Sequence, residues 1–453
     1  MRKYDLTQGG IMRKLLLVAV PIMSTQLLQM SYNLTDMFWL GRLSSDAVAA
    51  SGTAGMYLWL SMAFLLFGRM GSEIGVSQSM GKNDSAKAQK YAQNAICLAA
   101  VLGLGYGLLC IFGSDMLISF FGIREAHVAR DAADYLSITG FGIPLAFVSY
   151  AITGTFNGSG NSRIPFLAHS VGFITNMALD PLFIFGLDMG VRGAAVATVI
   201  ANIVCLSLMV LSLKKSKGRP FAEFRFFVKP CRDIMKQIFR WSFPISCESL
   251  LFTFLSMIIT RIVFISPFGG ADAQSVMRVG SQIESLSWLI GGGFGSAVTA
   301  FTGQNFGAGK WPRIHKGRQI SVLVMSCWGV AVTLALYFFG RELTGIFLAE
   351  EHLRDMGATY LRILAFCQLP MCVEAVSAGI LRGMGKTLPP SIISTGSNIL
   401  RVPLAYALSL TALGLNGIWI GVTVGAVLRG AGMFVWCRID AAKRPKNEAS
   451  VNY

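Results

Sequence analysis

The sequence predicts an all-α integral membrane protein with twelve transmembrane helices in two six-helix bundles, related by a pseudo-twofold axis along the membrane normal. Three observations support this prediction: an apolar composition, twelve long apolar runs and an internal duplication. Of the 453 residues, 53% are hydrophobic and only 14% are charged, whereas a soluble domain carries about 25% charged residues. This composition excludes a disordered protein and most cytosolic enzymes.

The apolar residues are concentrated in segments long enough to cross a bilayer. A helix needs about 20 apolar residues to span the hydrocarbon core. Twelve runs meet this length: 15–39, 47–68, 91–113, 132–156, 165–187, 193–213, 241–267, 279–301, 319–340, 358–380, 391–413 and 416–437.

The basic residues between these runs predict the orientation. One side of the membrane receives 27 Lys and Arg residues, including those of the N-terminus and of the stretch 214–240, and the other side receives six. Cytoplasmic loops carry the excess of Lys and Arg. We therefore expect both termini in the cytoplasm, in the cytoplasmic membrane of a prokaryote. The net charge of +16 is then a topology signal, and no nucleic-acid partner is expected.

The chain resembles itself at an offset of about 225 residues. The offset aligns Pro21 with Pro244, "SDAVAAS" with "ADAQSVM", "FNGSGNS" with "LRGMGKT" and "VRGAAVA" with "LNGIWIG". Six spans return the chain to its starting side, so the two halves share one topology, as in parallel-repeat transporters. The predicted organisation is an N-terminal lobe over 1–213, a basic cytoplasmic linker over 214–240, a C-terminal lobe over 241–440 and a tail over 441–453.

Polar residues within the first span share one face. Thr25, Gln29, Tyr32 and Asp36 follow one another at steps of four, three and four residues, which places them on one side of a helix. A charge at the bilayer centre costs about 2.5–3.5 kcal/mol on insertion scales. This stripe therefore faces the bundle interior, with Asp36 toward the outer end of the span.

Spans five and six supply matching groups. Asn176 and Asp180 lie four residues apart, Pro181 follows and bends the helix, and Thr198 lies at a similar depth in span six. With Asp36 they form an all-oxygen pocket suited to a proton or to a hard cation such as Na⁺. The alternative is a hydrogen-bond network that only holds helices together, but such bonds average about 0.6 kcal/mol, too little to offset two buried acids.

The second half does not repeat this pocket. Arg401 takes the register of Asn176, and Ala405 takes that of Asp180. Glu248 and Glu374 are the acids of spans seven and ten; they either face a central cleft and attract a cationic substrate, or pair with Arg401 or Arg362. Glu284 and Arg278 are expected to play structural parts.

No motif predicts an enzyme. "GILRGMGKT" (379–387) imitates a phosphate-binding loop, but its first glycine is one residue too far away and the segment ends a membrane helix. The four histidines are scattered, and neither a metal-ligand cluster nor a nucleophile with a nearby base occurs. We expect no cofactor and no nucleotide, so the coupling energy must come from an ion gradient or from the solute.

The ordered motifs resemble the multidrug and toxic compound extrusion (MATE) family. They are "NLTDMFWLGRLSSDAVAA" (33–50), "GTFNGSGNSRIP" (154–165), "NMALDPLFI" (176–184), "FGSAVTAFTGQNFGAGK" (294–310) and "SAGILRGMGKTLPP" (377–390). The chain looks like the DinF-like branch, which implies a cation site at Asp36, Asn176, Asp180 and Thr198, and a substrate chamber near Gln29, Tyr32 and Asn157.

The other branch, NorM-like, uses acids of the C-terminal lobe. Its characteristic Asp of span ten is Met371 here, although Pro370 is kept. This difference argues against a NorM-type ion site, while Met371, Glu248 and Glu374 remain candidates for the substrate chamber.

The resemblance implies an antiporter that exports amphipathic, mostly cationic, small molecules in exchange for H⁺ or Na⁺. Its partners would be organic cations and membrane lipids, and a monomer suffices because one chain holds both lobes. The alternative is a flippase for a lipid-linked precursor, which would line its cleft with cations for phosphate. An intramembrane enzyme or receptor would need a catalytic dyad or a sensory domain, and neither is recognisable in the sequence.

Overall fold

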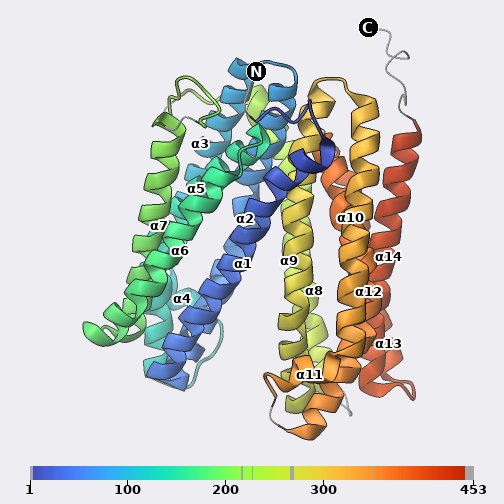
Figure 1. Cartoon of the computed structure of the whole chain (residues 1–453). Coiled ribbons are helices and arrows are strands. Elements are labelled where there is room, and N and C mark those ends of the chain that lie inside the picture. The colour runs from blue at the N-terminus through green and yellow to red at the C-terminus, as the bar shows by residue number, and fades with distance from the viewer. Residues whose placement is uncertain (1–3, 216–217, 227, 266–269, 349, 444–453) are drawn as a thin grey trace. The chain divides into compact units, whose positions relative to one another are not determined.

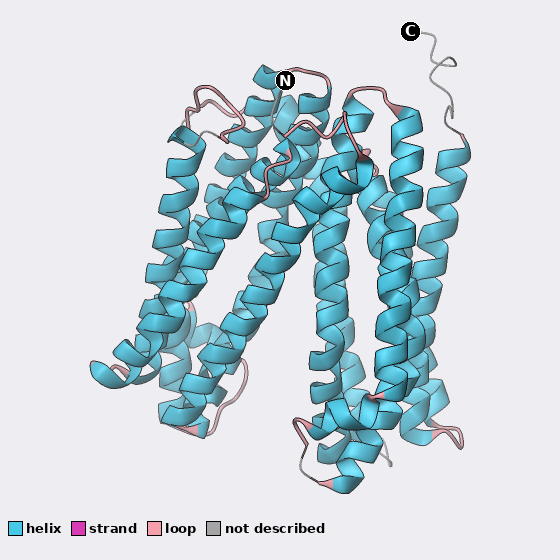
Figure 2. Ribbon diagram, viewed as in Figure 1, coloured by secondary structure: helices cyan, strands magenta, loops and turns pink. Residues whose placement is uncertain are grey.

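The structure, a computed structural model, describes residues 4–215, 218–226, 228–265, 270–348 and 350–443 (Figure 1). Over these residues it consists of helices and connecting loops (Figure 2). The predicted tail 441–453 lies mostly outside the described residues, as do positions 216, 217 and 227 of the linker.

The helices of the first half are α1 (Ile11–Leu43), α2 (Ser45–Gly81), α3 (Ser85–Phe112), α4 (Ser114–Ser119), α5 (Ala126–Ser159), α6 (Arg163–Pro181) and α7 (Gly190–Lys215). Those of the second half are α8 (Arg232–Ile265), α9 (Ala271–Gly307), α10 (Trp311–Phe338), α11 (Gly340–Gly345), α12 (Glu351–Gly383), α13 (Leu388–Ser409) and α14 (Gly414–Ala442).

Each predicted span falls on one long helix, and the all-helical membrane fold is confirmed. Among the described residues, ten helices are long and apolar enough to cross a bilayer. The two predicted spans outside these ten, the eighth and the eleventh, fall on α9 and α13. These are also long helices, of 37 and 22 residues. Several helices extend well beyond the apolar runs; α2 continues to Gly81 because its last turns, including the fully buried Glu73, are covered by protein.

The described chain divides into two compact units. One contains Leu17–Ser246, and the other contains Thr7–Leu16 with the described residues from Cys247 onward. The division falls inside α1 and inside α8, the helices that carry the aligned prolines Pro21 and Pro244.

Equivalent glycines bring helices together in each unit. A Cβ on Gly158 of α5 would lie 2.6 Å from the Glu73 carbonyl oxygen of α2, and one on Gly383 of α12 would lie 2.6 Å from the Thr299 carbonyl oxygen of α9. Small residues permit this close backbone approach between membrane helices. The two halves therefore share a packing contact as well as a sequence pattern. The short helices α4 and α11, which the sequence analysis did not anticipate, also occupy corresponding places.

Pro181 ends α6 in a specific way. It is followed by a π-helical turn, Leu182–Gly186, in which the Leu187 N–H donates to the Leu182 carbonyl at 2.9 Å. Proline lacks a backbone N–H, so one carbonyl of the preceding turn loses its helical donor. The sequence predicts a bend at this proline; the structure shows a widened π-helical turn on its C-terminal side.

Candidate functional site: buried carboxylates and a cavity in the first unit

Three helices of the first unit carry the predicted cation-binding residues. Asp36 is on α1, Asn176 and Asp180 are on α6, and Thr198 is on α7. Asn176 and Asp180 are almost completely buried. The Asn176 amide satisfies both of its ends when its nitrogen donates to Asp180 Oδ2 at 2.9 Å and its oxygen accepts from the Thr198 backbone N–H at 3.1 Å. These contacts join α6 to α7 through the side chains that the sequence analysis grouped.

The two carboxylates leave oxygen atoms without hydrogen bonds. Among the described residues, Oδ1 of Asp36 and Oδ1 of Asp180 are buried and have no hydrogen-bond partner. The carboxylates are close enough to repel each other electrostatically. A buried acceptor without a donor is costly, and a proton or a hard cation removes this cost. The donor set of carboxylate, amide and hydroxyl oxygens fits both.

Two tyrosines lie near the same carboxylates. Tyr32 and Tyr135 both interact electrostatically with Asp36 and Asp180. Helical spacing in the sequence predicted Tyr32 on the polar face of α1, whereas Tyr135 of α5 was not among the predicted site residues. Tyr135 and Thr139 lie four residues apart on α5 and both are buried, so a polar face on span four was the signal that pointed to it.

A cavity of about 150 Å³ lies in the first unit beside this cluster. It is lined by Gln29, Tyr32 and Thr198, together with residues of α2, α5 and α6. The Tyr150 hydroxyl donates to Gln29 Oε1 at 3.4 Å. Asn157, the third predicted chamber residue, is buried in the last turns of α5 and does not line this cavity.

His169 is a second residue that sequence reasoning set aside. It lines the cavity from α6, between Tyr150 and Phe173, with ring centroids 5.2 and 5.8 Å away. The Thr153 hydroxyl donates to the Ser149 carbonyl at 2.9 Å, so it accepts from His169 Nε2 at 3.1 Å. The other ring nitrogen then accepts from the Cys205 thiol at 3.5 Å. One cavity wall is therefore aromatic and hydrogen-bonded.

The two acids that the sequence placed in spans seven and ten, Glu248 and Glu374, have arginine partners. Glu248 accepts from the Ser391 hydroxyl at 2.9 Å and lies 3.7 Å from Arg382. Glu374 lies 2.8 Å from Arg429 Nε. These partners are Arg382 and Arg429, and neither Arg401 nor Arg362, the residues suggested by the sequence, pairs with them. Met371 is half-buried on α12 and packs against the apolar core of its unit.

Two further polar residues of the second unit have defined roles. Arg401 donates to the Ser256 hydroxyl at 2.9 Å and stacks over the Phe252 ring. Glu284 accepts from the Gln368 amide at 3.2 Å. Both contacts connect different helices, as the structural role expected for Glu284 requires.

Replacing Arg429 by Met is expected to destabilise the protein by about 3 kcal/mol, because it leaves the carboxylate of Glu374 buried without its cation. The matched control is Arg192→Met, which removes a solvent-exposed ion pair with Asp134 and should cost less than about 1 kcal/mol. Thermal unfolding of the purified variants measures the difference. Equal shifts in the two variants would contradict this assignment.

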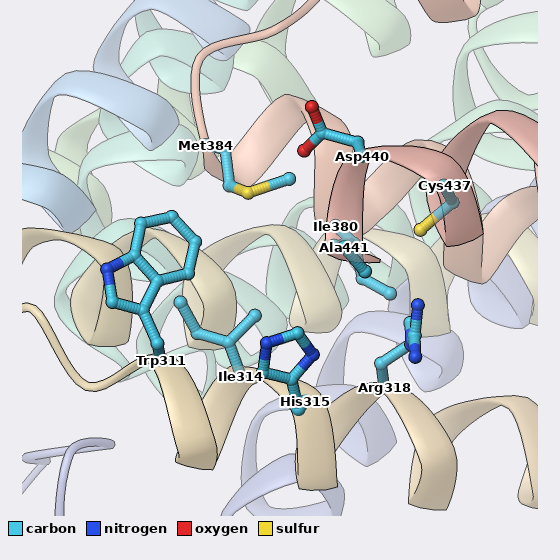
Figure 3. A pocket seen from close by; sticks show the side chains of 9 residues that line it. All are labelled: Trp311, Ile314, His315, Arg318, Ile380, Met384, Cys437, Asp440 and Ala441. Atoms are coloured by element: carbon cyan, nitrogen blue, oxygen red, sulfur yellow. The ribbon is translucent and has the colours of Figure 1, made fainter. Parts of the chain in front are cut away.

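A small cavity lies near the end of α14 in the second unit (Figure 3). It is lined by Trp311, His315 and Arg318 of α10 and by Cys437 and Asp440 of α14. Its volume is about 10 Å³, room for about one water molecule. Asp440 also forms an ion pair with Lys386. The cavity is too small for an organic substrate.

The MatE family model matches residues 21–182 and again residues 244–407. This chain belongs to the MatE family. The two matches begin at Pro21 and Pro244, the prolines that the duplication aligns, and the family resemblance is therefore confirmed.

Two curated relatives match the chain over most of its length. A probable multidrug resistance protein NorM of Thermotoga maritima is 28% identical over 429 residues, covering 92% of this chain and 90% of that protein. The probable multidrug resistance protein YpnP of Bacillus subtilis is 27% identical over 448 residues, covering 98% of this chain and 99% of that protein.

Solved structures show the same fold. The outward-facing conformation of a multidrug resistance MATE family transporter of the MOP superfamily superposes with a TM-score of 0.91 at 21% identity, over 98% of both chains. A crystal structure of MATE in complex with MaD3S has the same TM-score at 22% identity, over 98% of this chain and 99% of that one. Among the described residues of this MatE chain, no group of three or more His, Cys, Asp or Glu residues is arranged to hold a metal ion.

Proposed function

We propose that this chain is a secondary active antiporter, which exports amphipathic, mostly cationic, drugs or toxic organic compounds in exchange for H⁺ or Na⁺. The observation that carries the proposal is the pair of carboxylates Asp36 and Asp180 beside a cavity of the first unit. Each has one buried oxygen, Oδ1, without a hydrogen bond among the described residues. The names of the relatives favour drug export over the flippase alternative.

The coupling ion acts at these carboxylates in the proposed mechanism. In the outward-open state Asp36 and Asp180 take up H⁺ or Na⁺, which removes their mutual repulsion. When Asp36 is neutral, α1 can bend. The hinge is at Pro21, because the missing N–H of proline removes a helical hydrogen bond. The bend reduces the cavity beside Gln29 and Tyr32, and the substrate leaves.

Alternating access then completes the cycle. The protein opens inward, the ion dissociates into the cytoplasm, and new substrate binds. Each charge moved across the membrane contributes about 2.3 kcal/mol per 100 mV. Asn176 and Thr198 connect the ion site on α6 to α7. The proposed assignment to the DinF-like branch depends on these residues together with Asp36 and Asp180.

The remaining expectations follow from the sequence. We propose that each half of the chain forms one six-span lobe, that the basic segment 214–240 links them in the cytoplasm, and that both termini are cytoplasmic. Glu248, Glu374, Met371 and Asn157 are proposed to contribute to the chamber in other states of the cycle, and the protein is proposed to act as a monomer in the cytoplasmic membrane.

Proteoliposomes loaded with a fluorescent cationic dye test this function. A pH gradient and a sodium gradient are imposed separately on wild type, on Asp36→Asn and on the control Asp115→Asn, whose carboxylate is exposed. We expect one of the two gradients to drive dye export by wild type and by the control. The Asp36→Asn variant should not export dye in response to that gradient. This result identifies the ion. Equal export by Asp36→Asn would overturn the coupling assignment, and dye transport that ignores both gradients would overturn the antiporter.

A further inference from the structure

A basic groove in the second unit has no part in the proposed transport cycle. It has a volume of about 710 Å³ and lies between the segment 7–13 and the first turns of α10. Four of its lining residues are basic: Arg13, Lys310, Arg313 and Lys316. No lining residue is acidic. Two segments about 300 residues apart in the sequence thus bring four cations to one concave surface.

The groove is held together by its own contacts. Lys310 Nζ donates to the Thr7 carbonyl at 3.0 Å and ties the two segments. Arg313 stacks over the Phe301 ring at 5.6 Å. Among the described residues, Arg13, Lys310 and Lys316 form no ion pair, so their charges are not neutralised within that part of the protein.

Two helix N-termini open onto the same groove. α1 begins after Gly10, which has no side chain to cap it, and α10 begins after Lys310, which makes no side-chain cap. Neither helix has an acidic residue in its first turn. The positive end of a helix dipole favours anions, and here it adds to the side-chain cations. At the start of α10, the Trp311 N–H donates to the Gly309 carbonyl at 3.0 Å and Pro312 has no N–H, so the contribution of that helix is its dipole.

The groove is apolar at its margin. Ile11, Met12 and Ile320 line it beside the cations. Met12 and Leu16 lie four residues apart on α1, and each is at least 39% exposed. A ligand could therefore place an anionic headgroup in the groove and an apolar chain along α1. A phospholipid has this combination of groups.

We propose that this groove binds an anionic phosphate group, as carried by a phospholipid headgroup or by free phosphate. Phosphate is favoured because Lys and Arg side chains and helix N-termini all recognise it. Because residues 7–16 group with the second unit while the rest of α1 groups with the first, a phosphate held here stabilises the start of α1.

The test uses the full chain purified in a neutral detergent. Thermal unfolding midpoints are measured while dioctanoyl phosphatidylglycerol, dioctanoyl phosphatidylcholine or inorganic phosphate is titrated. The variant is Arg13→Gln with Lys316→Gln, both exposed in the groove. The matched control is Arg438→Gln with Lys443→Gln, which removes two exposed charges from the same unit outside the groove.

We expect phosphatidylglycerol to raise the midpoint of wild type and control, and phosphatidylcholine not to. The groove variant should need about 30-fold more phosphatidylglycerol, since each Lys or Arg contributes roughly a factor of five. A response to inorganic phosphate at the same concentrations supports free phosphate as the source; a response to the lipid alone supports the headgroup. The proposal would be overturned if the groove variant and the control variant lost the phosphatidylglycerol-dependent shift of the midpoint equally. It would also be overturned if the two lipids raised the midpoint of wild type equally.

Discussion

Export by the Asp180→Asn variant is expected to fall to the level of liposomes without protein, with either ion gradient imposed. Asp180 is fully buried, and one of its carboxylate oxygens has no hydrogen bond within the described structure. Asparagine has the same shape but neither takes up a proton nor balances a cation. The Asn176 amide can donate to the new side chain as it does to Asp180 Oδ2, so the contact between α6 and α7 should persist.

The folded state of this variant is the necessary control. Its unfolding midpoint should match that of Asp115→Asn, which changes an exposed carboxylate of α4 in the same way. A folded Asp180→Asn protein that still exports dye at the wild-type rate in response to the gradient would exclude Asp180 from ion coupling. Together with Asp36→Asn, the measurement separates a site that needs both carboxylates from one that needs only the residue on α1.

Replacing Gly158 by Leu is expected to destabilise the first unit by about 3 kcal/mol or more, at the upper end of the cost of overpacking. The new Cβ would lie 2.6 Å from the Glu73 carbonyl oxygen, and a backbone atom of α2 cannot rotate away as a side chain does. The helices α2 and α5 must separate. Gly383→Leu should have the same effect between α12 and α9, because the Thr299 carbonyl is equally close.

Gly105→Leu is the matched control for this prediction. A Cβ at Gly105 of α3 meets no atom within 4 Å, so the added side chain enters open space. Size-exclusion profiles and unfolding midpoints of the three variants decide between the outcomes. If Gly105→Leu is as damaging as Gly158→Leu, the cost comes from the substitution itself and not from the close helix contact.

The apolar pattern was sufficient to predict the helices, because a bilayer imposes one length and one hydrogen-bonding solution on every spanning segment. The apolar pattern did not predict where the helices end. α2 continues to Gly81 through Arg69 and Glu73 because protein, and not lipid, covers those turns. Coverage of this kind depends on residues distant in sequence, and hydropathy does not record it.

The candidate ion site divides in the same way. Helical spacing alone placed Gln29, Tyr32 and Asp36 on one face of α1, and Asn176 with Asp180 on one face of α6. The presence of Tyr135 and His169 in the same region depends on how α5 and α6 pack. Pairing in the second half was also beyond the sequence. Arg429 of α14, and neither Arg401 of α13 nor Arg362 of α12, pairs with Glu374, because the packing of different helices against one another decides which arginine comes close.

The sequence by itself determined the membrane class, the helical spans, the duplication and the MatE family, since each depends on local composition or on a repeated order of motifs. Only the tertiary structure decided which acids have partners and which do not, where the cavity lies, and that the segment 7–13 meets α10 in a basic groove. The physical reason is the distance along the sequence over which each property is determined. Periodicity fixes the face of one helix, whereas burial, pairing and cavities are properties of side chains from several helices at once.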